Sequence, residues 1–355
     1  MSNGVVSVII PTFNRAYCIE RAIDSAANQT HRAVEIIVVD DGSTDNTRDV
    51  IARRYASDPR VRYVYQDNQG VATARNHGIR LATGDYAAFL DSDDVWKPWK
   101  TELQLCCLHL VPEAGMVWSD MEAIDSQGAL LSAKYLRTMY KAAYRWFTNE
   151  NLFSGSRPIN QACPVHGAPA HETRVFWGDI FSPMVMGNLV HTSTTLIRRE
   201  RLEKVVGFNE DLKFSGEDYD FHLRTCREGP VAFLDLATIE YQVGRADQLT
   251  RPAYRIHMAH NFLKTITPIL DRDRNRIDLP APMLAHVQAE AHAWIGREHL
   301  ELGQLRDTRA HLVQSLRYQA WQPRVWILLA LAVFPSGFYR MVKSTFRFAK
   351  RSIGQ

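Results

Sequence analysis

The sequence predicts an α/β fold built on a mostly parallel sheet. Its first hundred residues alternate short apolar runs with amphipathic segments of helical periodicity. The apolar runs are continuous and rich in Val and Ile, which is typical of strands buried on both faces. Strands that alternate with helices of about a dozen residues indicate right-handed βαβ units, and these place the strands in parallel.

Each element can be assigned from its own pattern. We expect strands at 5–10, 34–39, 61–65 and 86–90, and helices at 17–29, 44–55 and 71–82. Ser43 or Thr44 is the expected N-cap of the second helix, because both side chains can accept a hydrogen bond from its free N–H groups.

The second half is less regular and becomes helical towards its end. We expect a strand at 192–197, a helix at 199–206, a polar cluster at 214–224 leading into a helix, and a strand at 232–241. Segments 285–302 and 305–319, joined at Gly303, resemble one tetratricopeptide-like hairpin. A single copy indicates a packing hairpin and not a repeat array.

Charge is distributed unevenly in a chain that otherwise has the composition of a folded protein. The net charge is +3, with 46% apolar and 23% charged residues. No acidic residue follows Asp307, so all charged residues in 308–355 are basic. Such a tail can meet anionic lipid or nucleic acid; we expect lipid and no nucleic acid.

The apolar segment Trp326–Tyr339 precedes most of this basic tail. It is shorter than the roughly 20 residues that span a bilayer, and Pro335 interrupts it. We therefore expect residues 326–355 to lie on a membrane surface. The alternative is a core helix followed by a solvated basic tail.

The cysteines and the N-terminus predict a cytoplasmic protein. The five cysteines show no CxxC spacing and no sign of a disulfide framework. A strand pattern begins by Val5, which leaves no room for a signal peptide. The expected location is the cytoplasm, with peripheral attachment to the inner membrane face if the tail binds lipid.

Polar clusters follow three of the predicted strands. They are 11–14 (PTFN), 40–43 (DDGS) and 91–94 (DSDD). Ligands of open parallel sheets bind outside the carboxyl ends of the strands. Asp91, Asp93 and Asp94 would repel one another unless they shared a cation, and oxygen ligands suit Mg²⁺ or Mn²⁺. The alternative is an Asp-rich turn or helix cap.

Three further features carry candidate chemistry. Asp40 or Asp41 can accept hydrogen bonds from a nucleoside, although Asp-Gly-Ser is also a routine turn. Arg75 lies near a predicted helix start and can offset phosphate charge, although a lone Arg is more often an ion-pair partner. Glu217 and Asp218 begin a helix, where acids also act as caps, and one of them can remove a proton from a nucleophile.

Five ordered motifs together resemble an inverting family-2 glycosyltransferase with the GT-A fold. They are VSVIIPTFNR, IIVVDDGSTD, NQGVATARNHGI, GDYAAFLDSDD and LEKVVGFNEDLKFSGEDYDFHLR, and the resemblance covers about Val5–Tyr241. It implies a mixed, mostly parallel sheet flanked by helices, with a C-terminal helical extension. The expected domains are 1–251, with a nucleotide-binding half (1–110) and an acceptor half (111–251), and a helical extension (252–355) with the apolar and basic tail.

The resemblance also implies roles for individual residues. Pro11, Thr12 and Asn14 would line the nucleotide pocket, Asp41 would contact the base, and Asp40 would order the loop. Asp91 would meet the ribose or a metal-bound water, and Asp93 would hold Mg²⁺ or Mn²⁺ on the donor diphosphate. Asp218 matches the catalytic base and Glu217 its neighbour. Arg75, Arg245 and Arg251 are candidate phosphate contacts.

The implied reaction moves a sugar from a nucleotide-diphosphate sugar, with UDP as the favoured nucleotide, to a glycan or lipid-linked acceptor. A nucleotidyltransferase would need a Gly-rich basic loop after the first strand, and 11–15 is not one. The remaining alternative is a non-catalytic sugar-nucleotide-binding or scaffold component of a polysaccharide assembly. A zinc site at Cys163, His166 and His171 lacks an evident fourth ligand, and His191 has no special spacing.

Overall fold

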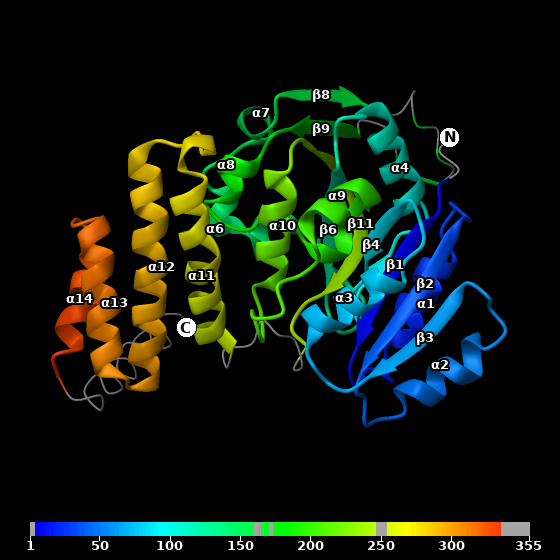
Figure 1. The fold of residues 1–355 in the computed structure, drawn as a ribbon, viewed down its shortest axis with the longest axis horizontal. Coiled ribbons are helices and arrows are strands. Elements are labelled where there is room, and N and C mark those ends of the chain that lie inside the picture. The colour runs from blue at the N-terminus through cyan, green and yellow to red at the C-terminus, as the bar shows by residue number, and fades with distance from the viewer. Residues whose placement is uncertain are drawn as a thin grey trace. The chain divides into compact units, whose positions relative to one another are not determined.

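The computed structural model describes residues 4–159, 163, 165, 167–169, 173–245 and 254–334. The chain divides into two compact units, 1–248 and 249–355, and each is described by itself. Figure 1 shows a layered α/β unit and a group of helices.

The first unit contains one mixed sheet, which among the described residues has 11 strands. The strands are β1 (Val6–Thr12), β2 (Val34–Asp41), β3 (Val61–Gln66), β4 (Tyr86–Phe89), β5 (Val95–Trp96), β6 (Met116–Ile124), β7 (Leu130–Ser132), β8 (Gly155–Pro158), β9 (Arg174–Gly178), β10 (Leu196–Arg198) and β11 (Val231–Gln242). Their main order is β3-β2-β1-β4-β10-β6-β11-β9-β8, with β5 paired to β11 and β7 to β6.

The sheet changes character at β10. Strands β3, β2, β1 and β4 are all parallel, with Val6 of β1 opposite both Val34 and Tyr86. Strand β10 is antiparallel to β4 and to β6, whereas β6 and β11 are parallel. Strand β1 is fully buried, as the continuous apolar run predicts for a central strand. The predicted α/β class is therefore confirmed, with a mixed sheet that is parallel throughout from β3 to β4.

Helices cover the sheet and close its connections. They are α1 (Ile19–Ala27), α2 (Thr47–Tyr55), α3 (Val71–Leu81), α4 (Lys100–Leu110), α5 (Leu136–Met139), α6 (Lys141–Tyr144), α7 (Asn149–Leu152), α8 (Phe181–Met184), α9 (Arg199–Val205) and α10 (Glu217–Arg227). Helix α3 packs on β1 and β2, and α4 packs on β6 and β11.

Two local expectations were wrong. Helix α2 begins at Thr47 and not at 44, because the Asp45 carboxylate accepts hydrogen bonds from the Thr47 N–H and hydroxyl and holds the preceding turn. Residues 192–194 form a 3-10 turn, so the strand starts only at Leu196. There the Thr194 and Thr195 hydroxyls bond carbonyls three residues back, which favours a turn over an extended strand.

The second unit is helical in its described part. Its helices are α11 (Arg255–Arg272), a 3-10 turn (Arg274–Arg276), α12 (Ala281–Leu302), α13 (Leu305–Tyr318) and α14 (Pro323–Leu331). Successive helices pack against one another. Gly303 ends α12 with φ of 78°, a left-handed conformation that glycine adopts without strain. The predicted hairpin is present.

The apolar segment at the end of this unit is only partly described. Trp326 lies in α14, whereas residues 335–355 lie outside the described residues. No helix in the described ranges is long and apolar enough to cross a bilayer.

Candidate active site

Three polar clusters share one edge of the sheet. Strands β2 and β4 pair in parallel with β1 from either side, so the three chain segments leave the sheet at neighbouring positions. This arrangement brings residues 11–14, 40–43 and 91–94 to the edge where α/β sheets bind ligands.

The loops after β1 and β2 are bonded to each other. Asn14, with φ of 52°, accepts hydrogen bonds at Oδ1 from the backbone N–H groups of Thr44 (2.8 Å) and Asp45 (3.3 Å). Its own N–H donates to Ser43 Oγ at 2.8 Å. The Thr12 hydroxyl is buried and has no hydrogen-bond partner among the described residues. Asn14 therefore organises this edge, and Thr12 offers it an unused polar group.

The carboxylates of Asp40 and Asp41 are bonded to protein donors. Asp40 accepts from the Ser43 N–H (2.9 Å) and the Tyr63 hydroxyl (2.8 Å). Asp41 accepts from the side chain of Gln66 (2.8 Å) and from the backbone N–H groups of Gln69 (2.9 Å) and Gly70 (2.8 Å). Both residues thus hold the turn and the start of α3.

Gly42 permits this turn to lie against the next loop. Its φ is 81°, and a Cβ there would lie 2.8 Å from the backbone nitrogen of Asn68. No other residue type could occupy the position without moving the loop.

The acidic cluster after β4 lies in electrostatic surroundings that differ from those of Asp40 and Asp41. Burial, together with the charges of Asp94 and Asp91, raises the pKa of Asp93 to about 7. Burial also raises the pKa of Asp94. For Asp91, burial is outweighed by the positive charges of Arg75 and His191, and its pKa lies below the usual value. Carboxylates this close favour a shared cation.

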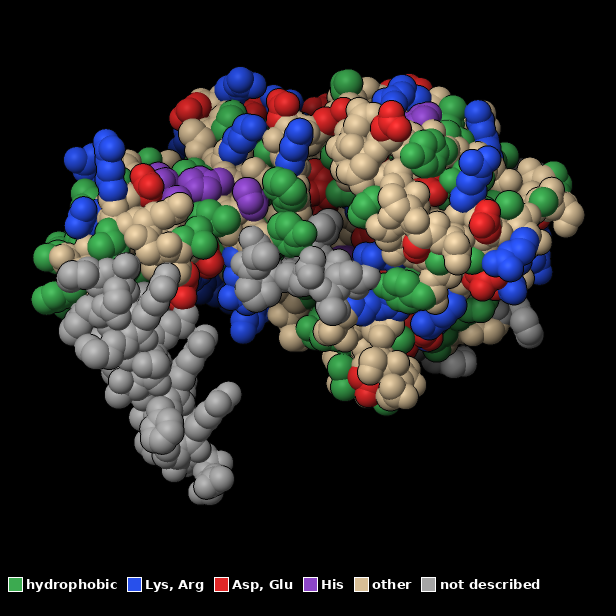
Figure 2. All heavy atoms as spheres, turned by 90° about the horizontal axis from the view of Figure 1, so that it is seen from below, with side chains coloured by type: hydrophobic (Ala, Val, Ile, Leu, Met, Phe, Trp, Pro, Cys, Tyr) green, Lys and Arg blue, Asp and Glu red, His purple; other side chains and the backbone are tan. Residues whose placement is uncertain are grey.

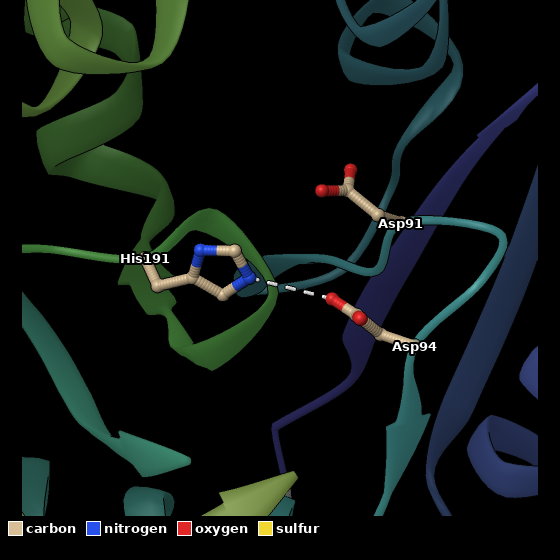
Figure 3. A group of neighbouring side chains, drawn as sticks. All are labelled: Asp91, Asp94 and His191. Carbon is tan, nitrogen blue, oxygen red and sulfur yellow. Dashed lines mark hydrogen bonds and ion pairs between the residues drawn. The ribbon is translucent and has the colours of Figure 1, made fainter. Parts of the chain in front are cut away.

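His191 completes a group that could hold such a cation. Ligand atoms of Asp91, Asp94 and His191 all lie within 4.8 Å of one another. Figure 3 shows these three side chains as neighbours. His191 Nε2 lies 3.4 Å from Asp94 Oδ2, and its Nδ1 lies 3.2 Å from the Tyr140 hydroxyl. Asp93, the predicted ligand, is not one of the three. The sequence predicts no ligand role for His191, which has no special spacing, and its contact with Asp94 spans 97 residues.

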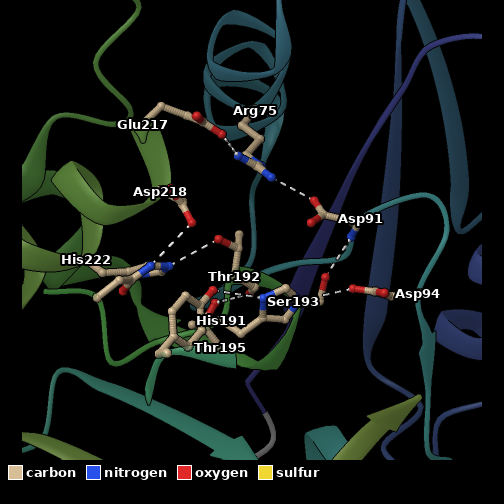
Figure 4. Close-up of polar contacts among 12 residues, drawn as sticks. Arg75, Asp91, Asp94, His191, Thr192, Ser193, Thr195, Glu217, Asp218 and His222 are labelled. Carbon is tan, nitrogen blue, oxygen red and sulfur yellow. Dashed lines mark hydrogen bonds and ion pairs between the residues drawn. The ribbon is translucent and has the colours of Figure 1, made fainter. Parts of the chain in front are cut away.

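Arg75 joins this cluster to the start of α10. Its guanidinium donates to Asp91 at 2.7 Å and to Glu217 at 2.8 Å, and it lies over the Phe208 ring at 5.1 Å from the centroid. Its Nε is buried without a hydrogen-bond partner among the described residues. Of the two interpretations of Arg75, a phosphate contact or an ion-pair partner, the structure shows the ion pair (Figure 4).

The two acids at the start of α10 have raised pKa values. Burial, followed by the charge of Asp218, raises the pKa of Glu217 to about 7, although Arg75 opposes the shift. Burial likewise raises the pKa of Asp218. Asn188 Nδ2 donates to Asp218 Oδ2 at 3.3 Å. The acids are therefore stronger proton acceptors, once ionised, than exposed carboxylates.

The turn at 192–195 contacts the first residue of the acidic cluster and helix α10. Ser193 Oγ accepts from the Asp91 N–H at 3.1 Å, and the Thr192 hydroxyl lies 3.2 Å from His222 Nε2. Burial lowers the pKa of His222 to about 3, so this ring is neutral at pH 7. Figure 4 shows the turn between the two acidic groups. Asn188, His191 and Ser193 had no local sequence signal that identified them.

Arginine side chains provide positive charge near the acidic cluster. The charges of Arg15 and Arg245 oppose the rise in the pKa of Asp93. Arg245 Nη1 donates to the Tyr17 hydroxyl at 3.2 Å. Arg251 lies outside the described residues.

The expectation of unpaired cysteines was wrong for one pair. Cys106 and Cys163 form a disulfide with a Cα–Cα distance of 6.0 Å, across a sequence separation of 57 residues. The fold, and not a local spacing, brings them together. Cys163 therefore cannot supply a zinc thiolate, and the other two residues of that alternative, His166 and His171, lie outside the described residues. Cys18, Cys107 and Cys226 are free and buried.

Comparison with known proteins agrees with the sheet and its motifs. Residues 7–105 match the family model of glycosyl transferase family 2. The chain is 38% identical over 136 residues to the chondroitin synthase of Escherichia coli, covering 38% of this chain but only 20% of that protein. The matched stretch is thus a small part of that relative.

Two solved structures share the fold. A mannosyltransferase from Pyrobaculum calidifontis, solved with GDP-Man and Mn²⁺, has a TM-score of 0.52 at 20% identity and covers 97% of this chain and 84% of its own. TarS 1–349 of S. aureus, solved with UDP-GlcNAc, has a TM-score of 0.51 at 15% identity, covering 97% and 92%. The chain therefore shares the GT-A fold, and its residues 7–105 are similar to glycosyl transferase family 2.

Proposed function

We propose that the chain is an inverting glycosyltransferase that uses a nucleotide-diphosphate sugar. The observation that carries this proposal is the Arg75 bridge between Asp91 and Glu217. It ties the acidic strand end, where a donor diphosphate would bind, to Glu217, the neighbour of the Asp218 carboxylate that would take the proton of the acceptor. Residues 1–110 would bind the donor and 111–251 the acceptor, with residues 252–355 as a helical extension.

The donor atoms at the strand end suit a divalent cation. Two carboxylates and one imidazole lie within reach of a single ion. Burial, and to a smaller extent the charge of neighbouring aspartates, raises the pKa values of Asp93 and Asp94, and an ion would relieve that repulsion. We propose that Asp91, Asp94 and His191 hold Mg²⁺ or Mn²⁺, with Asp93 beside them. Such an ion supplies Lewis-acid stabilisation of the leaving diphosphate.

Side chains of the chain itself would accept the proton of the acceptor hydroxyl and orient the catalytic base. The Asp218 carboxylate accepts the proton of the acceptor hydroxyl, whose oxygen forms a bond to the anomeric carbon while the bond from that carbon to the diphosphate oxygen breaks. Arg75 holds Glu217 next to this base, and Asn188 orients the base through Oδ2. One displacement inverts the anomeric configuration, and no carboxylate nucleophile is needed.

The donor and acceptor classes are inferred from relatives. One structural neighbour was solved with UDP-GlcNAc and another with GDP-Man and Mn²⁺; a UDP-sugar is our favoured donor. A chondroitin synthase among the relatives favours a glycan or lipid-linked acceptor in polysaccharide or glycoconjugate synthesis. We place this activity at the inner membrane face on the basis of the basic tail, because the Cys106–Cys163 disulfide removes the argument from unpaired cysteines.

A donor panel with Asp218→Asn tests the assignment. Transfer and hydrolysis are measured with UDP-, GDP- and dTDP-sugars, with and without Mn²⁺. We expect one donor class to react, and Asp218→Asn to lower turnover by about 10²–10⁴-fold while nucleotide affinity is kept, since general-base catalysis contributes that much. The exposed Asp211 on the approach to α10 provides the matched control, Asp211→Asn. Donor binding without turnover in the unaltered chain would instead support the scaffold alternative.

The membrane contact rests on exposed apolar side chains around α14. Trp321 is 84% exposed, Trp326 53% and Ile327 61%, and Arg324 lies among them. We expect the full chain to co-sediment with vesicles rich in anionic lipid, and Trp321→Ser with Ile327→Ser to weaken this binding. Equal sedimentation with neutral vesicles or by the double variant would refute the contact.

A further inference from the structure

Four histidines from three helices gather on the surface of the second unit. His260 lies on α11, His292 and His299 on α12, and His311 on α13. We call them the histidine patch; Figure 2 shows histidine side chains grouped together on one face. The ring of His311 lies 5.7 Å from that of His260 and 5.7 Å from that of His299, centroid to centroid.

The ring nitrogens of the patch approach in two pairs. His260 Nε2 lies 3.2 Å from His299 Nε2, and His292 Nδ1 lies 3.0 Å from His311 Nδ1. Two imidazoles can share one proton at these distances, but two imidazolium ions would repel each other. Burial and the neighbouring rings lower the pKa of His311 to about 4, and burial lowers those of His260 and His292. At pH 7 the rings of His260, His292 and His311 are therefore neutral, and each has a ring lone pair.

The first pair has the spacing of two ligands on one metal ion. With metal–nitrogen distances near 2.05 Å, two nitrogens at tetrahedral or right angles are about 2.9–3.4 Å apart. The 3.2 Å between the two Nε2 atoms lies within this range. Neutral imidazole is a ligand that suits Zn²⁺, Cu²⁺ and Ni²⁺.

Gln304 orients one of the two rings for this role. His299 Nδ1–H donates to Gln304 Oε1 at 2.6 Å. That bond fixes the tautomer and leaves the lone pair on Nε2, which faces His260. Metal-binding histidines characteristically donate their second N–H to an oxygen acceptor in this way.

We propose that His260 and His299 bind a divalent transition-metal ion and thereby link α11 to α12. The site is separate from the glycosyl-transfer chemistry, because its ligands come from the helical unit and are imidazoles, whereas the acidic cluster offers mainly carboxylates. Occupation would stabilise the helical unit, since the ion binds the folded arrangement of the pair.

Metal titration of the full, untagged chain tests the site. Zn²⁺ is titrated by equilibrium dialysis and Cu²⁺ by electron paramagnetic resonance at pH 7.5. We expect the unaltered chain to bind one more equivalent than His260→Gln or His299→Gln, and its Cu²⁺ spectrum to show coupling to two nitrogens. His286→Gln is the matched control, because His286 also lies on α12 and its Nδ1 lies 3.2 Å from Gln319 Oε1 of the segment after α13. It should bind as the unaltered chain does.

Two graded changes separate ligation from a structural role. Gln304→Leu should weaken Zn²⁺ binding by about tenfold, because loss of an outer-shell hydrogen bond typically has that effect. Lowering the pH to 5 should release the ion, because protons compete for the same lone pairs. Unchanged stoichiometry and affinity in both His260→Gln and His299→Gln would overturn the proposal. His260 is exposed, so we expect its replacement to preserve the fold. Circular dichroism of the variant checks this.

Discussion

The carboxylates at the end of β2 and those after β4 lie on either side of β1, yet their surroundings differ. Asp40 and Asp41 accept five hydrogen bonds from nearby protein donors at 2.8–2.9 Å. Asp93 and Asp94 are buried beside like charge, and the pKa of each is raised. The first pair is satisfied by the fold, whereas the second group gains from a cation that the fold does not supply. We therefore expect the two pairs of aspartates to differ in function because of the hydrogen-bond donors around them, and not because of their position at the sheet edge.

Loss of Arg75 should have the largest effect, because its guanidinium pairs with Asp91, the first carboxylate after β4, and with Glu217. Arg75→Met would leave Asp91 and Glu217 without their partner, and breaking a buried ion pair from one side costs about 3–5 kcal/mol of unfolding free energy. Urea unfolding at pH 7 measures this. Arg80→Met, at an exposed position of the same helix, should change stability by less than about 0.5 kcal/mol. A similar small change in Arg75→Met would show that the bridge is not structural.

The strand ends could be predicted from sequence, but the contacts between them could not. A continuous apolar run followed by polar residues identifies a parallel strand and its carboxyl end, as at Asp40 and Asp91. The partners of those ends are distant in sequence: Arg75 and Glu217 are 142 residues apart, and Asp94 and His191 are 97 apart. No local periodicity encodes such pairs. The same reason hid the disulfide between Cys106 and Cys163, whereas Gly303 and the helices around it followed from local rules.

Replacing one acid from each group tests the difference directly. Asp41→Ala leaves the Gln66 amide and two backbone N–H groups without their acceptor, so we expect a loss of about 2–3 kcal/mol, with or without Mn²⁺. Asp94→Asn should change the stability of the metal-free chain by less than about 1 kcal/mol, because relief of repulsion offsets weaker hydrogen bonds.

Added Mn²⁺ should separate the two variants further. At one hundred times its dissociation constant the ion should stabilise the unaltered chain by about 2.7 kcal/mol, and this gain should persist in Asp41→Ala but disappear in Asp94→Asn. Thermal and urea unfolding of the unaltered chain and both variants, each with and without Mn²⁺, give the six values. If Mn²⁺ stabilises Asp94→Asn as strongly as the unaltered chain, Asp94 is not a ligand.

The smallest expected effect concerns His222. Burial disfavours the charged form of this base, as it does for the buried aspartates. Its ring is buried, and its pKa of about 3 lies below the value of about 6.5 in the unfolded chain. Between these values the unfolded chain binds more protons, so stability rises with pH and is lost as pH falls below about 6.5. At pH 5.5 the loss amounts to about 1.4 kcal/mol. His222→Gln removes this titration. Between pH 7.5 and 5.5 the stability of the variant should therefore fall by about 1.4 kcal/mol less than that of the unaltered chain. His109→Asn, at an exposed position of α4, is the control and should keep the original slope. Identical slopes in His222→Gln and the unaltered chain would mean that His222 is not held neutral by burial at the centre of the site.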